Sequence, residues 1–239
     1  MTVRWIGQSG YVIQTQSTQI IIDPYLSDAV NRVVGRPRLV ASPTNPPEIK
    51  ADAIICTHDH LDHLDVDAIA QMDKALLFIT TAEGKAKLNT MGFENVQALS
   101  PGESTAVGDV EITAVFASHT VEAFGVILKA EDKTLYFSGD TLFDQRLFEI
   151  EKFRPDIAFL CINGRLGNMN GSEAAIAARK IGAKLNIPNH YGMFASNTAD
   201  PHTFTERIDN GFIMEFNKEY QVQRNKLHLT GENTVEIVI

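Results

Sequence analysis

Three of the seven histidines in this 239-residue chain fall within six residues, and this clustering constrains the structure more than any other feature. They follow the apolar run at residues 53–56, which predicts a buried strand. Where a strand ends, side chains two residues apart point the same way, so His58 and His60 can converge on one ion. Asp62 and His63 lie beyond the following bend and can serve a neighbouring ion. The alternative is a polar turn with solvent-facing histidines, but metal-ligating groups rarely gather at this density without a ligand role.

The types of side chain indicate which ions fit. Imidazole and carboxylate groups without a thiolate suit Zn²⁺, Mn²⁺ or Fe²⁺. We therefore expect one or two divalent metal ions, with zinc and manganese favoured over iron. The two cysteines, Cys56 and Cys161, lie inside apolar stretches. They are expected to be small core residues, and not a disulfide or a thiolate metal site.

The charge balance limits the kinds of partner. The chain has 21 Lys and Arg against 30 Asp and Glu, a net charge of −9, which argues against a large nucleic-acid-binding face. The first residues carry no signal-peptide pattern, and no apolar run approaches the ~20 residues that a membrane helix requires. These features predict a cytoplasmic protein that acts on a small molecule without nucleic-acid or membrane partners. They leave a homo-oligomer open.

Apolar and turn-forming residues alternate in a way that predicts many short strands with fewer helices. The predicted strands cover residues 3–6, 11–14, 19–22, 53–56, 76–79, 103–107, 110–117, 123–130, 134–138, 157–162, 185–188, 212–216, 226–230 and 234–239. The predicted helices cover residues 66–72, 83–91, 143–152, 171–182, which Ser172 opens, and 201–210, which Asp200 caps. Residues 31–50, rich in Pro and Arg, are expected to run over the surface.

This order of elements predicts an α/β protein with two sheets face to face and helices outside. No repeat, low-complexity tract or long linker interrupts it. We expect one domain over residues 1–239, made of two αβ halves at roughly 1–120 and 121–239.

The segment from His58 to His63 resembles the His-x-His-x-Asp-His signature of the metallo-β-lactamase fold. Four further positions resemble that family's later and earlier motifs, each at the end of an apolar stretch: Asp23, His119, Asp140 and His190. The resemblance implies a four-layer αβ/βα sandwich of two mixed β-sheets with helices outside and metals at one edge. It also implies that Asp23 braces the metal loop.

The same resemblance implies a ligand set for two ions. The first site is His58, His60 and His119; the second is Asp62, His63 and His190; Asp140 bridges the two. A water between the ions would lose a proton and attack the substrate as hydroxide. Asp62 would orient that water and shuttle a proton, so Asp62 and Asp140 are the expected catalytic residues. Asp23, Asp59, Asp65 and Ser118 are candidate hydrogen-bond partners for the imidazole rings, with surface positions as the alternative.

Three later stretches, residues 163–169, 189–194 and 196–201, narrow the resemblance. They are similar to the branch that contains L-ascorbate-6-phosphate lactonase and its shorter relatives. His60 stands where the diiron flavoprotein branch has Glu, which favours hydrolysis over redox chemistry. Arg165, with Asn163 and Asn168 around it, is expected to clamp a phosphate or carboxylate, or else to be a surface charge. Tyr191 is expected to donate a hydrogen bond to the substrate.

The resulting functional prediction is a metal-dependent hydrolase. It would open a lactone or cleave an ester of a small sugar acid, with or without a phosphate. A metal-dependent phosphodiesterase is the alternative enzyme, because the same type of site hydrolyses phosphate esters in other branches. A non-catalytic metal-binding protein is the alternative from another class, and the complete ligand set argues against it.

Overall fold

Strands that are apolar on both faces organise the molecule, whose computed structural model describes residues 1–223, 226–229 and 236–238. In β3 (Gln19–Ile22), Ile20 and Ile22 pack into one cluster of buried side chains, and Ile21 packs into another. Consecutive side chains of a strand point to opposite faces, so such a strand is stable only when both faces are covered. The first cluster fills the space between two sheets and extends to the helical residues 147–150 and 174–181, and the second lies between a sheet and its outer helices.

Nine of the described strands form the first sheet, in the order β15-β14-β13-β1-β2-β3-β4-β5-β6. Their bounds are β1 Thr2–Gly7, β2 Gly10–Gln14, β3 Gln19–Ile22, β4 Ala53–Ile55, β5 Phe78–Thr80, β6 Val96–Ala98, β13 Glu219–Gln223, β14 Lys226–Leu229 and β15 Glu236–Val238. β3 to β6 are parallel, and the remaining pairs are antiparallel. The sheet is therefore mixed, and it joins strands from both ends of the chain.

Six strands form the second sheet, in the order β12-β11-β10-β9-β8-β7, within the described part of the chain. Their bounds are β7 Ser104–Val107, β8 Val110–Phe116, β9 Phe124–Ala130, β10 Lys133–Phe137, β11 Ile157–Cys161 and β12 Leu185–Asn189. β10, β11 and β12 are parallel, and the others are antiparallel. The strands do not follow the division expected near residue 120, because β7 and β8 precede it and β13 to β15 return to the first sheet.

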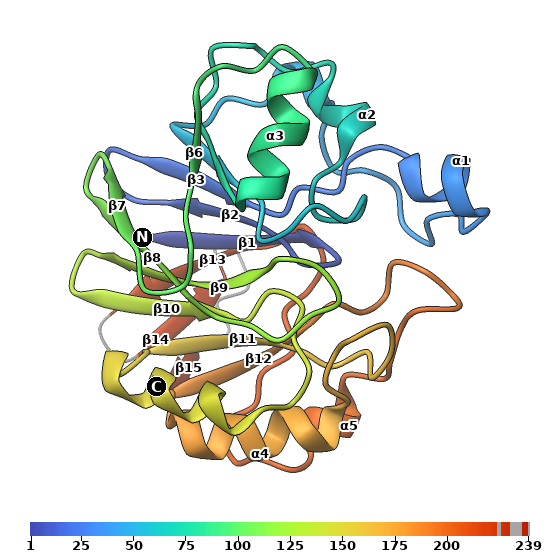
Figure 1. Ribbon diagram of the computed structural model, residues 1–239. Helices are drawn as coiled ribbons and strands as arrows, with labels where there is room; N and C mark the ends of the chain where they lie inside the picture. Colours follow the sequence, from blue (N-terminus) through green and yellow to red (C-terminus); the bar gives the residue numbers. More distant parts are fainter. Residues whose placement is uncertain (224–225, 230–235, 239) are drawn as a thin grey trace.

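The helices lie on the outer faces of the two sheets, so the predicted sandwich of two mixed sheets is confirmed (Figure 1). Their bounds are α1 Ala29–Val34, η1 Pro46–Glu48, α2 Val66–Ile69, α3 Ala82–Thr90, η2 Gln145–Phe153, α4 Gly171–Ile181 and α5 His202–Thr205, where η is a 3₁₀ helix. α2 and α3 cover the first sheet, α4 and α5 cover the second, and α1 projects from one end. Among these helices none is both long enough and apolar enough to span a bilayer.

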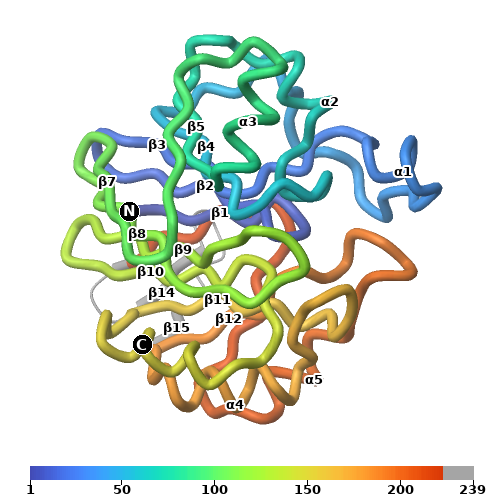
Figure 2. The backbone as a smooth tube through the Cα atoms, viewed as in Figure 1, coloured from blue at the N-terminus to red at the C-terminus, as the bar shows by residue number. Residues whose placement is uncertain are grey.

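The parallel strands bring polar residues to one edge of the two sheets, because the carboxyl ends of parallel strands lie on the same side. β3 is followed directly by Asp23 and β12 by His190, and Asp140 lies three residues beyond the end of β10, after Ser138 and Gly139. The chain after β4 reaches His58 three residues beyond Ile55. Figure 2 shows α1 (blue) and the loop after β12 (orange) on the same side of the molecule.

The helix predicted at residues 143–152 is present as the 3₁₀ helix η2, Gln145–Phe153. Two local predictions are wrong. The predicted helix at 201–210 is only the four-residue α5, because Asn210 hydrogen-bonds the backbone of Ala183 and the side chain of Asn186 and leaves the helix path. Residues 212–216 are not a strand: only Gly211 forms a bridge, to Asn186.

Two strands, β6 and β13, were not predicted from the sequence, since each is short and mixes polar with apolar residues. Of the two predicted C-terminal strands, residues 230, 234, 235 and 239 lie outside the described residues. Cys56 and Cys161 are buried and free, as predicted.

The start of α4 gives a testable prediction. Asn170, and not Ser172, caps this helix: its side chain accepts hydrogen bonds from the backbone N–H groups of Ser172 and Glu173, and the Glu173 carboxylate accepts one from the backbone N–H of Asn170. Asn170→Ala should lower the free energy of unfolding by about 1 kcal/mol, whereas exposed Ser172→Ala should change it by less than about 0.5 kcal/mol. Urea denaturation followed by circular dichroism measures both. A larger loss in Ser172→Ala would contradict the assignment.

Candidate metal centre

The structure brings all seven predicted ligands together where the strand ends of the two sheets meet. They form three overlapping groups: His58, His60 and His119; His58, His63 and Asp140; and Asp62, His63 and His190. Within each group, one potential ligand atom per residue lies within 4.8 Å of the others. The members come from four separate loops, so tertiary folding and not local sequence creates the cluster.

The first group consists of ring nitrogens that face one another. His60 Nδ1 lies 3.0 Å from His58 Nε2 and 3.2 Å from His119 Nε2. Nitrogen ligands lie roughly 2.0–2.1 Å from a tetrahedral zinc ion, which places them about 3.3 Å from each other. The observed spacing therefore fits a small divalent cation between the three rings.

Asp140 lies between the first group and the second. Its Oδ1 is 3.3 Å from His63 Nε2, while its Oδ2 is 3.2 Å from His190 Nε2 and 3.8 Å from His119 Nε2. His190 Nε2 is also 3.4 Å from Asp62 Oδ2. The carboxylate of Asp140 thus contacts members of both groups, which is the position expected of a bridging ligand.

Two buried atoms in this cluster have no hydrogen bond to any described residue, although they face each other at 3.3 Å. His63 Nε2 and Asp140 Oδ1 make no hydrogen bond within the described part of the chain. A buried polar atom without a partner costs about 1–3 kcal/mol, and more when it is charged. Bound cations would remove this cost, so the residues present fit the metal ions that their types imply.

The ionisation of the carboxylates also suits a cation. Burial alone would raise the pKa of Asp140, but the positive charges of His190 and His63 outweigh it and hold that pKa well below its ordinary value. Burial would likewise raise the pKa of Asp62, and the charge of His63 with a hydrogen bond from His190 lowers it instead. Both carboxylates are therefore ionised at neutral pH, which is the form that binds metals.

The pKa values of histidines in the two groups shift in opposite directions. Burial lowers the pKa of His58 well below its ordinary value and keeps the ring neutral. Burial would also lower the pKa of His190, but the charges of Asp140 and Asp62 raise it to about 9. The side of the cluster next to the carboxylates thus attracts positive charge, whether from a proton or from a metal ion.

Asp23 orients His63 from behind the cluster. Its carboxylate accepts hydrogen bonds from the backbone N–H of Thr57 (2.7 Å) and from Thr57 Oγ1 (2.8 Å), and it lies 2.8 Å from His63 Nδ1. His63 Nε2 is thereby directed toward Asp140. Asp23 has φ 43°, a left-handed backbone that a non-glycine residue adopts at a cost, and such strain often marks a functional site. The bracing role expected of Asp23 is confirmed.

The other candidate partners of the rings have different contacts. Asp59 binds Lys87 Nζ of α3 through its carboxylate at 2.6 Å and its carbonyl at 2.9 Å, which ties the loop to that helix. Asp65 accepts from the N–H groups of Leu26 and Ala68. The N–H of Ser118 donates to Thr141 Oγ1. The expectation that these three contact imidazole is wrong. The partner of Asp59 is the ammonium group of Lys87, Asp65 accepts from backbone N–H groups, and Ser118 donates to the side chain of Thr141.

Gln8 is a site residue that the sequence reasoning missed. Its Nε2 donates to Asp62 Oδ2 at 2.8 Å and lies 3.0 Å from His190 Nε2, while its Oε1 is buried without a hydrogen bond among the described residues. Its backbone is left-handed, with φ 52°. The only signal was a polar pair between Gly7 and Gly10 that joins two apolar strands, a pattern common to ordinary turns.

A cavity of about 390 Å³ opens onto the cluster. Its lining comprises Val30, Val34, Arg36, His60, Leu61, Asp62, Thr120, Asp140, Leu166, His190, Phe194 and Asn197. Four predicted metal ligands are among these residues, so a bound small molecule can reach the cluster. A volume of this size matches a small organic ligand.

The four predicted substrate residues lie outside that lining. Arg165 donates to the carbonyl of Ser196 at 3.3 Å. Asn168 donates to Asn163, which in turn donates to Asn197, so the two asparagines join loops behind the cavity. Tyr191 is buried against Trp5, with ring centroids 4.8 Å apart. Direct substrate binding by these four residues stays a prediction.

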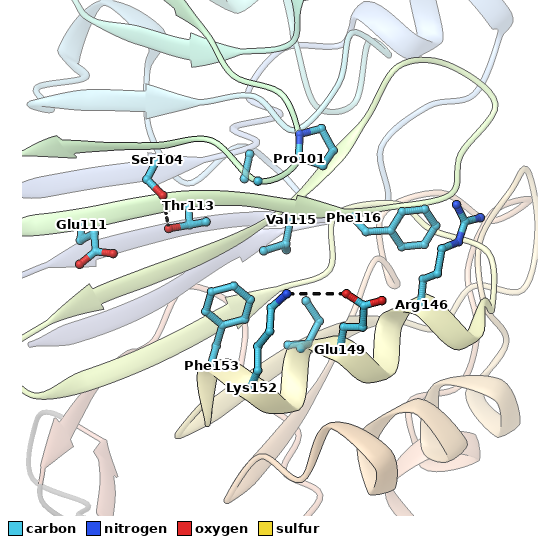
Figure 3. A pocket seen from close by; sticks show the side chains of 13 residues that line it. Pro101, Ser104, Glu111, Thr113, Val115, Phe116, Arg146, Glu149, Lys152 and Phe153 are labelled. Carbon is cyan, nitrogen blue, oxygen red and sulfur yellow. Dashed lines mark hydrogen bonds and ion pairs between the residues drawn. The ribbon is translucent and has the colours of Figure 1, made fainter.

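A second cavity, of about 470 Å³, lies between β8 and η2 (Figure 3). Its basic side chains already have partners: Arg146 pairs with Asp144 and lies over the ring of Phe116, and Lys152 pairs with Glu149. None of the seven clustered residues lines it. The cavity beside the cluster is therefore the candidate active site.

Comparisons with known proteins agree with this geometry. A model of the beta-lactamase superfamily domain matches residues 18–191. A UPF0173 metal-dependent hydrolase of Shouchella clausii is 33% identical over 227 residues, which cover 88% of this chain and 94% of that protein. The solved structure of Igni18, a metallo hydrolase of Ignicoccus hospitalis, has a TM-score of 0.76 at 20% identity and covers 93% of this chain and 99% of its own. The metallo-beta-lactamase fold protein YhfI of Bacillus subtilis has a TM-score of 0.63 at 19% identity, with 79% and 85% covered.

The contact between His119 and the loop before α4 gives a second prediction. His119 Nδ1 lies 3.1 Å from the carbonyl of Gly167, and a Cβ at Gly167 would lie 2.8 Å from that nitrogen. Gly167→Ala should displace the ring and weaken zinc binding roughly tenfold or more. Gly102→Ala is the matched control: its φ is +98° against +91° at Gly167, but nothing lies within 4 Å of the added Cβ. Zinc titration monitored by calorimetry compares the two, and equal affinities would contradict the role given to His119.

Proposed function

The chain belongs to the UPF0173 metal-dependent hydrolase family of the beta-lactamase superfamily, and from this membership we propose that it hydrolyses a lactone or an ester of a small organic acid. Membership of this family identifies the chain as a metal-dependent hydrolase. That its substrate is a lactone or an ester is our proposal. It is supported by the similarity of residues 163–169 and 189–194 to the lactonase branch of the fold and by a cavity of small-molecule size beside the cluster.

We assign the seven clustered residues as metal ligands. His58, His60 and His119 would hold one ion, Asp62, His63 and His190 the other, and Asp140 would contact both. The observation that carries the proposal is the pair His63 Nε2 and Asp140 Oδ1, which are buried 3.3 Å apart without a hydrogen bond in the described structure. A cation held by both residues would give each of these buried atoms the partner that it lacks.

The ions would supply the Lewis acidity that activates a water and polarises the scissile carbonyl group. The protein supplies the proton transfer. Asp62 lines the cavity, and its carboxylate can accept the proton of the attacking water and return it to the leaving alkoxide. Gln8 holds this carboxylate through Asp62 Oδ2, which fixes the direction from which the proton is taken.

Metal removal tests the family-level activity. Purified protein should contain one to two equivalents of zinc, manganese or iron by elemental analysis. Chelation should abolish hydrolysis of lactones and 4-nitrophenyl esters, and restoring the metal should restore it. Full hydrolysis by metal-free protein would contradict the mechanism. Hydrolysis of bis(4-nitrophenyl) phosphate without hydrolysis of any lactone or ester would show a phosphodiesterase instead.

Substitution of Asp140 tests the bridging assignment. Asp140→Ala removes the one negative charge between the two ions, so the ions repel each other with less compensation. We expect bound metal to fall below one equivalent and kcat to fall at least about 100-fold, with an unchanged circular dichroism spectrum. Asp144→Ala, which removes a partly exposed carboxylate paired with Arg146, is the control and should keep both values. Normal turnover by Asp140→Ala would show that Asp140 is an ordinary turn residue.

A further inference from the structure

We propose that the substrate is an amphipathic monoanion, with an apolar group that packs against α1 and the neighbouring loops and an anionic group that pairs with Arg36. This inference rests on the proposed function, because it places the scissile bond of that substrate beside the cluster. It names a different cation from Arg165 and a different chemical class from a sugar acid.

Arg36 differs from the other two arginines of its segment in having no partner. Arg32 forms two 2.7 Å hydrogen bonds with Asp67. Arg38 donates to the carbonyls of Tyr25, Ser27 and Val40, so its guanidinium fastens the segment. Arg36 is only partly exposed and makes no hydrogen bond or ion pair within residues 1–223, 226–229 and 236–238, yet it lines the cavity.

A free guanidinium in this cavity favours an anionic ligand. The chain carries a net charge of −9, so an anion approaches against the overall field of the protein. Arg36 offsets that repulsion locally, and its planar donors suit a carboxylate or a similar oxyanion. No other Lys or Arg lines the cavity within the described structure. Apart from the metal centre, the cavity therefore offers one positive charge, that of Arg36, which can neutralise one anionic group of a ligand.

The rest of the wall is apolar. Val30, Val34, Leu61, Leu166 and Phe194 come from α1 and from three loops around the cluster. Val34 and Leu166 are 55% and 58% exposed, an unfavourable position for large apolar side chains that border the same cavity. A bound apolar group would cover them, and each methylene buried in this way strengthens binding about fourfold. A sugar ring would instead bring hydroxyl groups that these side chains cannot bind.

The apolar wall is held in place before any ligand binds. The N–H of Leu39, which follows Arg36 by three residues, donates to the carbonyl of Met193 at 2.8 Å. The rings of Tyr25 and Phe194 pack with centroids 5.5 Å apart, and Ala29, Val30 and Met193 complete a small buried cluster with them. These contacts fix the α1 segment against the loop after β12, so the distance between the wall and the metal ligands is set by the fold.

A matched set of esters tests the proposal on the metal-loaded protein. The probes are 4-nitrophenyl acetate, 4-nitrophenyl hexanoate and the mono-4-nitrophenyl ester of hexanedioic acid. We expect kcat/KM to rise from acetate to hexanoate, because the chain is covered by the wall, and to rise again about tenfold or more for the hexanedioate monoester.

Two pairs of variants separate the two parts of the site. Arg36→Gln should reduce kcat/KM roughly 10- to 100-fold for the hexanedioate monoester and threefold at most for the hexanoate ester. Arg146→Gln, which removes the same charge from the second cavity, is its control. Val34→Ala should reduce the preference of hexanoate over acetate several-fold, because two methyl groups leave the wall. Its control is Val33→Ala, which removes a side chain that is 54% exposed and does not line the cavity.

A binding measurement keeps this proposal distinct from the proposed function. Hexane-1-sulfonate, whose sulfonate is a weak metal ligand, should bind the metal-loaded protein at least tenfold more tightly than hexan-1-ol in calorimetry. Arg36→Gln should abolish that difference. If no ester or lactone is hydrolysed but this difference is seen, the proposed function fails and the anion site stands.

Two results would overturn the amphipathic monoanion. The first is efficient hydrolysis with equal kcat/KM for all three esters, which leaves the hydrolase and removes the substrate class. The second is an equal loss on the hexanoate and hexanedioate esters in Arg36→Gln, which would mean that Arg36 supports the segment and does not bind the anion.

Discussion

The mutual repulsion and desolvation of buried polar groups is the constraint on which this structure depends. Five imidazole rings and two carboxylates face one another beside a single cavity: His58, His60, His63, His119 and His190 with Asp62 and Asp140. Several of their nitrogens approach within 3.0–3.2 Å without a hydrogen bond that could satisfy all of them. Such an arrangement is unfavourable by itself, because buried atoms such as His63 Nε2 and Asp140 Oδ1 have lost water without gaining a hydrogen bond within the described residues. Cations at the centre convert it into a set of ligands.

The two-sheet core supplies the rigidity that this arrangement needs. The strands β4, β10 and β12 are largely buried on both faces, and six of the seven ligands follow their carboxyl ends. The seventh, His119, follows β8. Behind the ligands, Asp23 orients His63, Gln8 holds Asp62, and the carbonyl of Gly167 fixes His119. Each of these contacts joins a ligand to a different part of the chain. The geometry of the centre is therefore a property of the whole sandwich, and a ligand set without this support would relax away from it.

The sequence predicted the elements and ligands that are encoded locally. His58 to His63 are close in sequence. His119, Asp140 and His190 each end an apolar stretch, and the resemblance to the metallo-β-lactamase signatures implied that they join the same site. Gln8 could not be found in this way, because its contact with Asp62 joins residues 54 positions apart through an ordinary-looking turn. From the sequence, Arg165 was the residue expected to bind an anion, and residues 31–50, which include Arg36, were expected to run over the surface. Only the folded chain shows that Arg36 lines the cavity and that Arg165 is turned to the carbonyl of Ser196.

The central claim is that the clustered histidines and aspartates form a two-metal centre. Anomalous X-ray diffraction at the zinc edge, from crystals of zinc-loaded protein, tests it most directly. The account predicts two peaks roughly 3.5–4 Å apart on either side of the Asp140 carboxylate. The first should lie among His58, His60 and His119, and the second among Asp62, His63 and His190. No peak at this cluster, or zinc bound only elsewhere on the protein, would contradict the account.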